Sequence, residues 1–340
     1  MGEKEELIIS GRMNLGIDPH LHIWHWEIPI YLFLGGLAAG LLFFAAYFVI
    51  SGKDKQFPTT VKYGPIISLV AIAIGLIVLI LDLKHPLYFW QLFTTVRLGS
   101  PMSWGAWTLV FMSIVNVIWI FSYAKEIFKG YKCRFKFMQK LTKLFVVEDD
   151  NFEYGWNWKY KIINTFEKYT QDKRKAWAWV MIVLAVILGV YTGILLSAFN
   201  ARPLWNTSIL GPLFLTSGLS TGAALLMILS KTQFEKHTFS RIDILLIVIE
   251  LFFIIHMFMG FLAASEVKAQ AAHYFLGGEF TVVFWINVVI LGLIIPAILE
   301  VLELLKFKIP VIVPGLLIIW GGLMFRFIMV DAGQITRFLY

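Results

Sequence analysis

The chain has 340 residues, of which 59% are hydrophobic and 15% charged, and its formal net charge at pH 7 is +7. Together with a mean hydropathy of +0.76, this composition excludes an ordinary soluble domain and predicts an integral membrane protein. The single cysteine, Cys133, excludes an internal disulfide, a cysteine-ligated iron–sulphur cluster and a Cys-x-x-Cys-His haem attachment. Electrons handled by this protein must therefore be held by a partner or by a diffusible carrier.

Eight long apolar stretches follow one another along the chain. A bilayer core about 30 Å thick takes roughly 20 helical residues, and a spanning segment must satisfy its own backbone hydrogen bonds. The expected transmembrane helices are 24–50, 61–84, 101–124, 175–199, 205–230, 241–265, 279–304 and 309–329. The sequence thus predicts an all-α integral membrane fold in one membrane domain, 1–340. Segment 1–23 lacks an apolar core before a cleavage site and is expected to be a mature tail.

The basic residues are divided unequally between the two sets of connections. Of the 29 Lys and Arg residues, 21 lie at 51–62, 125–175, 231–241 and 305–308. The positive-inside rule then places both termini outside. The rule applies less strongly to long loops such as 125–175. Without this loop, each of the two sets of connections holds eight Lys and Arg residues. We expect this loop to be cytoplasmic and, because it mixes bases with aromatic residues, to lie on anionic lipid headgroups rather than to dock a partner. The net positive charge of the chain does not require a nucleic-acid ligand to explain it.

Polar residues gather at the start of the first helix. Trp24, Glu27 and Tyr31 share one helical face, and His25 lies beside them. An interfacial aromatic belt explains the tryptophan well, and the helix dipole explains a carboxylate in the first turn. Neither explains Tyr31 and the histidine as well, so a functional role stays open. The pair Gly36 and Gly40 predicts a close helix contact.

Further polar residues lie near the ends of later helices. Asp82 is either an interfacial acid or a proton carrier. Ser103 stands at the start of the third helix, and Tyr191 lies about two turns before the end of the fourth, where a tyrosine normally hydrogen bonds. Arg202 follows in the next turn. Arg326, in the last helix, either snorkels to the interface or forms an internal pair with an acid such as Asp82.

Alternating helix directions bring eight of these residues to the same outer part of the bilayer. They are His25, Glu27, Tyr31, Asp82, Ser103, Tyr191, Arg202 and Arg326. Such a cluster can bind a carbonyl-bearing headgroup and exchange protons, while its apolar walls receive a long tail.

Two more polar residues lie deeper in the sixth helix. Glu250 and His256 are six residues apart and do not share a face. Either can be a step in a proton relay, and a satisfied polar pair in the core is an equally open interpretation. A haem held by two histidines is disfavoured, because His256 is the only histidine at that depth.

Several motifs, in order, resemble those of the NrfD-like membrane subunits typified by the polysulphide reductase membrane subunit. They are Trp24 through Gly40, Asp82 to Pro86, Ser100 to Trp107, Gly189 to Leu196, Arg202 to Asn206, Ser217 to Gly222 and Gly321 to Gln334. The resemblance implies two four-helix bundles that bind menaquinone or ubiquinone as substrate, without haem or an iron–sulphur cluster of their own. It also implies a ferredoxin-like iron–sulphur subunit and a molybdopterin catalytic subunit on the outer face of the cell inner membrane.

The resemblance also carries roles onto single residues. Tyr191 is similar to the tyrosine that hydrogen bonds a quinone carbonyl. Tyr31 and Ile28 stand where the polysulphide reductase subunit has a histidine and an asparagine, so the headgroup contacts are altered. His25 and Glu27 are expected to compensate, and Trp24 and Ser103 complete the predicted quinone site.

The resulting hypothesis is a quinone-reactive subunit of a respiratory oxidoreductase, with a polysulphide or other sulphur-compound reductase favoured. It is not an enzyme alone. Asp82, Arg326, Arg202, Glu250 and His256 are its expected proton path. The alternative is a proton or ion transporter without quinone chemistry, and a third is a purely structural anchor.

Overall fold

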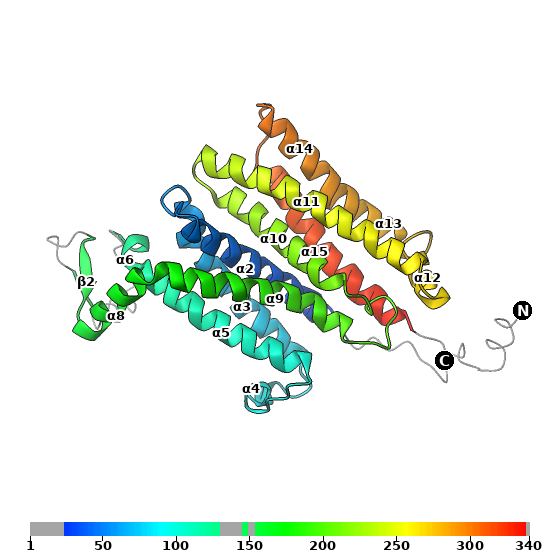
Figure 1. The fold of residues 1–340 in the computed structure, drawn as a ribbon, viewed down its shortest axis with the longest axis horizontal. Helices are drawn as coiled ribbons and strands as arrows, with labels where there is room; N and C mark the ends of the chain where they lie inside the picture. Colours follow the sequence, from blue (N-terminus) through cyan, green and yellow to red (C-terminus); the bar gives the residue numbers. More distant parts are fainter. Residues whose placement is uncertain (1–23, 130–144, 149–153, 338–340) are drawn as a thin grey trace, which may run out of the picture.

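The computed structural model describes residues 24–129, 145–148 and 154–337 (Figure 1). Within these residues, eight helices are long and apolar enough to cross a membrane, which confirms the predicted fold class. Their bounds are α2 (Glu27–Ile50), α3 (Pro58–Asp82), α5 (Pro101–Ser122), α9 (Arg174–Ser197), α10 (Leu210–Leu229), α11 (Gln233–Leu262), a seventh span over Thr281–Leu304, and α15 (Ile312–Ile335).

The seventh span is built of three consecutive pieces. α13 (Thr281–Val283) leads into the π-helix η2 (Phe284–Ile294), and α14 (Ile295–Leu304) follows. Pro296 stands directly after the change from the π-helix to α14, and its lack of an N–H removes one backbone hydrogen bond from the span at this junction. The helix α11 begins well before the predicted 241, because the Thr232 hydroxyl accepts a hydrogen bond from the backbone N–H of Glu235 and caps its first turn.

Shorter elements connect the spans. They are η1 (Pro86–Tyr88), α4 (Gln91–Thr94), α6 (Ala124–Ile127), β1 (Val146–Glu148), β2 (Trp156–Trp158), α8 (Lys161–Asp172) and α12 (Glu266–His273). The two strands pair antiparallel, with Val147 opposite Asn157. Loop 125–175 thus contains two short helices and a hairpin in its described part. Cys133 and the tail 1–23 lie outside the described residues.

The eight spans form two four-helix bundles, as predicted. α2, α3, α5 and α9 contact one another in the N-terminal bundle, and α10, α11, α14 and α15 do so in the second bundle. α2 packs against α10 at their interface, where two Gly-x-x-x-Gly pairs meet. A Cβ on Gly40 would lie 2.3 Å from the carbonyl oxygen of Gly218, and one on Gly222 would lie 2.8 Å from the Gly40 backbone. Only glycine permits this approach, which confirms the packing role predicted for Gly40.

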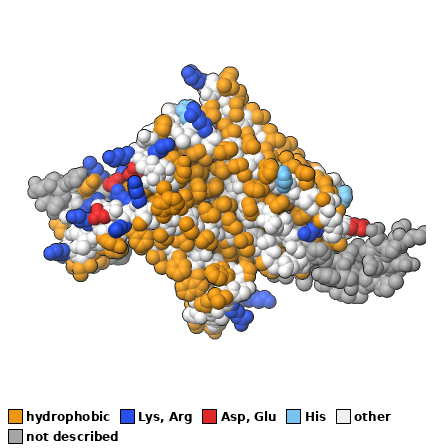
Figure 2. Space-filling model, in the orientation of Figure 1, with side chains coloured by type: hydrophobic (Ala, Val, Ile, Leu, Met, Phe, Trp, Pro, Cys, Tyr) orange, Lys and Arg blue, Asp and Glu red, His pale blue; other side chains and the backbone are white. Residues whose placement is uncertain are grey.

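The molecule has two ends, which the following sections name separately. At the site end, α2 begins and α15 ends, and connections 83–100, 198–209 and 263–280 lie at the same end. The loop end holds 51–57, 123–129, 145–148, 154–173, 230–232 and 305–311. Figure 2 shows hydrophobic side chains covering the helices between the ends, and Lys and Arg gathered over the loop end at the left of the view. This is the surface of a protein that spans a membrane.

Charged contacts fasten the loop end of the N-terminal bundle. Glu126 forms ion pairs with Lys62 at 2.8 Å and with Arg174 at 3.0 Å, and the Arg174 guanidinium lies over the Tyr123 ring at 3.7 Å. Burial acts to raise the pKa of Glu126, but the hydrogen bonds and charges of Lys62 and Arg174 outweigh it, and this pKa lies below its ordinary value. Burial raises the pKa of the Tyr123 hydroxyl to about 12.

Candidate functional site

Two tyrosines from different helices meet inside the N-terminal bundle near the site end. Tyr31 on α2 is 5% exposed and Tyr191 on α9 is 8% exposed. Their side chains are close enough to interact with each other. A buried phenol needs a polar partner, and here each can supply it for the other. The structure thus brings together the two tyrosines that the sequence analysis assigned to a headgroup.

Two further helices present a glycine to these rings, and the glycine of α5 makes room for one of them. A Cβ on Gly105 of α5 would lie 1.9 Å from Cζ and 2.1 Å from the hydroxyl of Tyr191. One on Gly75 of α3 would lie 3.7 Å from Cδ2 of Tyr31. All four helices of the N-terminal bundle therefore surround the pair. The sequence analysis missed the role of Gly105. Its position in the first turns of a span that also carries a polar residue could have indicated it.

A carboxylate lies one turn above the tyrosine pair, toward the site end. Glu27 stands four residues before Tyr31 and so shares its helical face. Its Oε2 atom is buried and has no hydrogen-bond partner. Asp82, the last residue of α3, lies within electrostatic range of both Glu27 and the exposed His25. Acids from two helices and a histidine thus lead from the tyrosine pair to the protein surface.

Trp24 and Arg202 have structural contacts at the same end. The Trp24 backbone N–H donates to Oε1 of Gln334 at 2.8 Å, and Nε2 of Gln334 donates to the Trp24 carbonyl at 2.9 Å. Its indole stacks on Trp205, with ring centroids 5.2 Å apart. The Arg202 guanidinium donates to the carbonyls of Gln334 at 2.6 Å and Thr336 at 3.0 Å, where α15 ends. These contacts tie α2 to the end of α15 and position the site; Gln334, an ordinary polar residue in the sequence, was not predicted.

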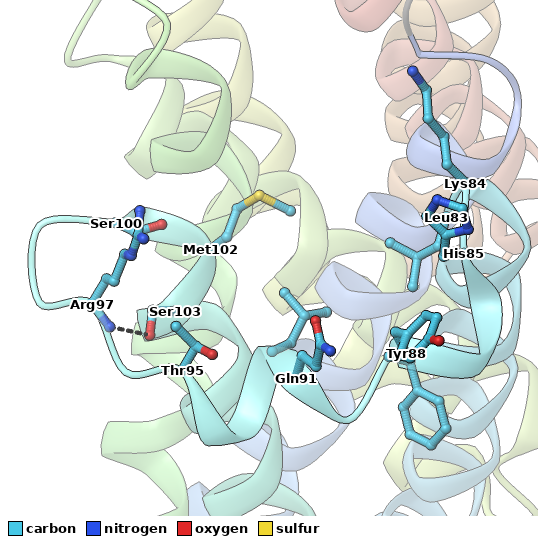
Figure 3. A pocket seen from close by; sticks show the side chains of 12 residues that line it. Leu83, Lys84, His85, Tyr88, Gln91, Thr95, Arg97, Ser100, Met102 and Ser103 are labelled. Atoms are coloured by element: carbon cyan, nitrogen blue, oxygen red, sulfur yellow. Dashed lines mark hydrogen bonds between the residues drawn. The ribbon is translucent and has the colours of Figure 1, made fainter.

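A cavity of about 450 Å³ lies beside the site in connection 83–100 and the start of α5. Its lining begins at Leu83, directly after Asp82, and includes Ser103. Figure 3 shows these side chains facing one another across the cavity, with the Ser103 hydroxyl accepting a hydrogen bond from the backbone N–H of Arg97 at 3.2 Å. Ser103 and Gly105 are two residues apart and so lie on nearly opposite faces of α5. Ser103 therefore lines this cavity and not the tyrosine pair.

Arg326 is fully buried, so it does not snorkel to the membrane–water interface. Its guanidinium donates to the Ser217 hydroxyl at 2.5 Å and to the carbonyls of Gly322 at 2.9 Å and Phe214 at 3.3 Å. Its acidic neighbour is Glu250, which lies within electrostatic range. Of the two predicted roles, the structure favours an internal pair over snorkelling. The acid of this pair is Glu250 and not Asp82, because Asp82 belongs to the N-terminal bundle.

The two deep residues of α11 separate, as their spacing implied. Glu250 is 2% exposed and has Ser217 as a close polar neighbour. The His256 ring is exposed, and its Nδ1 lies 2.8 Å from the carbonyl oxygen of Phe252, against whose ring it packs. The structure does not bring His256 to any other predicted site residue, and we leave it out of the proton path.

Comparison with known proteins finds a family match over nearly the whole chain. The family described as "Polysulphide reductase, NrfD" matches residues 17–337. The chain belongs to the NrfD family. It is 32% identical to protein NrfD of Escherichia coli over 92% of this chain and 96% of that protein. It is 30% identical to a component of the polysulfide reductase of Wolinella succinogenes, covering 92% and 94%, and 24% identical to a component of the selenate reductase of Mesobacillus selenatarsenatis, covering 95% and 76%.

Family membership and the eight spans make this chain a multi-pass membrane protein. The match covers both bundles, so both the tyrosine pair and the buried Arg326 lie within the part that defines the family.

Proposed function

We propose that this chain is the quinone-reactive membrane subunit of an oxidoreductase complex. The observation that carries the proposal is the buried hydroxyl pair of Tyr31 and Tyr191 near one membrane face. Polar groups within a bilayer are costly and usually functional. Two relatives are named as components of polysulfide and selenate reductases, which supports a place in a reductase complex.

The residues at the site fit a quinone headgroup. The two phenol hydroxyls can donate hydrogen bonds to carbonyl oxygens, and the unpartnered Oε2 of Glu27 can accept one from a quinol hydroxyl. The apolar helix surfaces around the pair suit an isoprenoid tail. Menaquinone and ubiquinone share these groups, and both suit the site.

A quinone supplies the electron chemistry by taking up two electrons and two protons, which it returns on oxidation. The chain's own residues bind the headgroup and move the protons. Tyr31 and Tyr191 orient the headgroup, Glu27 exchanges a proton with it, and Asp82 and His25 pass that proton to the surface at the site end. The cavity that follows Asp82 gives this route an exit.

Electrons must leave through a partner, because the chain's single cysteine cannot hold a cluster. We place a ferredoxin-like iron–sulphur subunit against the site end, with a molybdopterin subunit beyond it, outside the inner membrane. A sulphur-compound reductase is our preferred complex. This orientation puts both termini outside and the basic loop end in the cytoplasm, in agreement with the positive-inside rule.

The test is quinol oxidation by the purified complex with Tyr191→Phe. Loss of this hydroxyl leaves Tyr31 and the headgroup without a partner, and we expect turnover to fall by about tenfold to a hundredfold, the effect of one unmade buried hydrogen bond.

Tyr123→Phe is the matched control. Tyr123 is also buried, its hydroxyl has no hydrogen-bond partner, and it lies at the loop end. This control should keep normal turnover. Unchanged turnover for Tyr191→Phe in a fully assembled complex would reject the tyrosine site. A wild-type complex that never reacts with quinol would reject the function itself and favour a transporter or an anchor.

A further inference from the structure

The second bundle contains a row of buried acids that the proposed quinone site does not use. Glu303 and Glu300 lie on α14, and Asp243 and Glu250 on α11. Their exposed fractions are 7%, 0%, 0% and 2%, respectively. Four buried acids are exceptional within a bilayer, where each ionisable group is expensive.

The contacts of these acids follow one another from the loop end to the middle of the bundle. His237 lies 3.1 Å from Glu303. Glu303 and Asp243 are both electrostatic neighbours of Glu300, and Asp243 is in turn a neighbour of Glu250. From His237 to Glu250 the row extends about 20 Å along α11.

Hydroxyl groups accompany the row along its length. Ser240 donates to Oε2 of Glu303 at 3.0 Å, and Ser220 donates to Oδ1 of Asp243 at 2.7 Å. Ser217 accepts from Arg326 at 2.5 Å and is a close polar neighbour of Glu250. The longest interval, between Asp243 and Glu250, is about 10 Å along the helix. The serines of α10 lie beside this interval.

Only the two ends of the row carry a base. His237 faces Glu303, and Arg326 faces Glu250. In the described part of the chain, neither Asp243 nor Glu300 has a basic side chain within ion-pair distance. Oδ2 of Asp243 and both carboxyl oxygens of Glu300 are buried without a hydrogen-bond partner, and the two acids are electrostatic neighbours. An unpaired buried carboxylate is costly, and two such groups side by side repel each other, so these two middle acids hold their protons.

The outer end of the row opens into a cavity. His237 and Glu303 line a space of about 550 Å³ at the loop end, together with Lys236 and Lys306. The inner end reaches the interface between the bundles, since a Cβ on Gly36 of α2 would lie 3.2 Å from Nη2 of Arg326. The row therefore joins a surface cavity to the contact between α2 and α15.

A bound metal ion does not account for this arrangement. Among the described residues, no three His, Cys, Asp or Glu side chains converge as metal ligands do. The acids are strung out along two helices instead.

We propose that this row is a proton path from the loop-end cavity to Glu250. Each carboxyl takes a proton on one oxygen and releases one from the other, so the group is unchanged after each transfer. The hydroxyls of Ser220 and Ser217, with bridging water, carry the proton over the longest interval. Arg326 stays charged and makes the ionised form of Glu250 accessible, so that Glu250 can release the proton it receives. The inference goes beyond quinone binding and does not depend on it.

The test uses the full chain in lipid bilayers and infrared spectroscopy, with no turnover required. We expect the wild type to show the C=O band of protonated carboxyls at neutral pH, and this band to shift within minutes of transfer to D2O. Glu300→Gln and Asp243→Asn should each remove part of the band. Because glutamine and asparagine resemble the protonated acids, both variants should fold.

Two further variants separate a path from a set of static acids. Glu126→Gln is the control, since Glu126 is an acid outside the row that Lys62 and Arg174 keep ionised, and it should leave the band and its exchange rate unchanged. His237→Leu removes the titratable group at the cavity and should slow exchange of the remaining band at least tenfold. A wild type without the band, a band unaffected by both row variants, or exchange that is slow in the wild type or unaltered by His237→Leu would overturn the proposal.

Discussion

The two bundles place their polar groups in different ways. In the N-terminal bundle, Tyr31 and Tyr191 offer neutral hydroxyls close to the site end, and the nearby Glu27 reaches the surface within one turn. In the second bundle, carboxyls extend from the loop end toward the centre and finish at Arg326. Hydroxyls suit the orientation of a carbonyl headgroup, whereas carboxyls suit the storage and transfer of protons. We infer that the N-terminal half binds the ligand and exchanges its protons at the site end, whereas the second half carries protons from the loop end.

The largest effect should come from breaking the contact that joins the halves. Gly40→Ala places a Cβ 2.3 Å from the carbonyl oxygen of Gly218 and forces α2 away from α10. We expect a destabilisation of about 3 kcal/mol or more, the upper end for overpacking. Quinol turnover and carboxyl exchange should both fall. The measurement is thermal unfolding alongside these two assays.

Gly260→Ala serves as the control for this change. A Cβ on Gly260, within α11, would have nothing within 4 Å, so unfolding and both assays should stay as in the wild type. A Gly40→Ala protein with wild-type stability would show that the close approach of α2 and α10 is not required.

A smaller and more selective effect is expected at Gly105. The Gly105→Ala methyl group would overlap the Tyr191 ring, so the tyrosine must move away from its place beside Tyr31. Quinol turnover should fall about tenfold or more, as for one lost buried hydrogen bond. The carboxyl band of the second bundle should be unchanged, because the acid row lies on helices of the other bundle. Loss of both signals would mean that the halves do not act separately.

The N-terminal half was the easier one to predict. Its spans are uncharged runs of the required length, and Glu27, Tyr31 and Asp82 stand out as polar residues at the ends of such runs. The spacing of Gly36 and Gly40 alone predicted a close helix contact. The partnership of Tyr31 with Tyr191 could be expected only from helix directions, and the close approach of their side chains depends on the room that Gly105 leaves, which no local pattern reveals.

The acid row was missed for a physical reason. Glu300 and Glu303 stand at the end of a predicted span, where an acid is ordinarily solvated, and Asp243 lies among the charges that begin α11. Which of these side chains faces the interior depends on how α14 packs against α11. For the same reason the sequence analysis named Asp82 as a possible partner of Arg326, because sequence spacing does not show that Asp82 and Arg326 belong to different bundles.

The smallest expected effect concerns Glu126, an acid that is ion-paired, unlike the unpaired middle acids of the row. Glu126 has two bases, Lys62 and Arg174, where Asp243 and Glu300 have none among the described residues. Its folded-state pKa is lowered, so its contribution to stability is fully present above the unfolded value of about 4.3 and is lost as the pH falls through the lower folded-state value. The contribution should be under about 1 kcal/mol, because the pair is partly exposed.

The measurement is the unfolding midpoint of the wild type and Glu126→Gln between about pH 6 and pH 3. Their difference should be largest at the upper end and should shrink below about pH 4.3, the unfolded value of a glutamate. Glu279→Gln removes an exposed acid of the site end that has no ion-pair partner among the described residues, and it should not reproduce this trend. A difference that grows as the pH falls would contradict the sign of the Glu126 shift. It would also weaken the contrast between a paired acid that stays ionised and the unpaired acids that keep their protons.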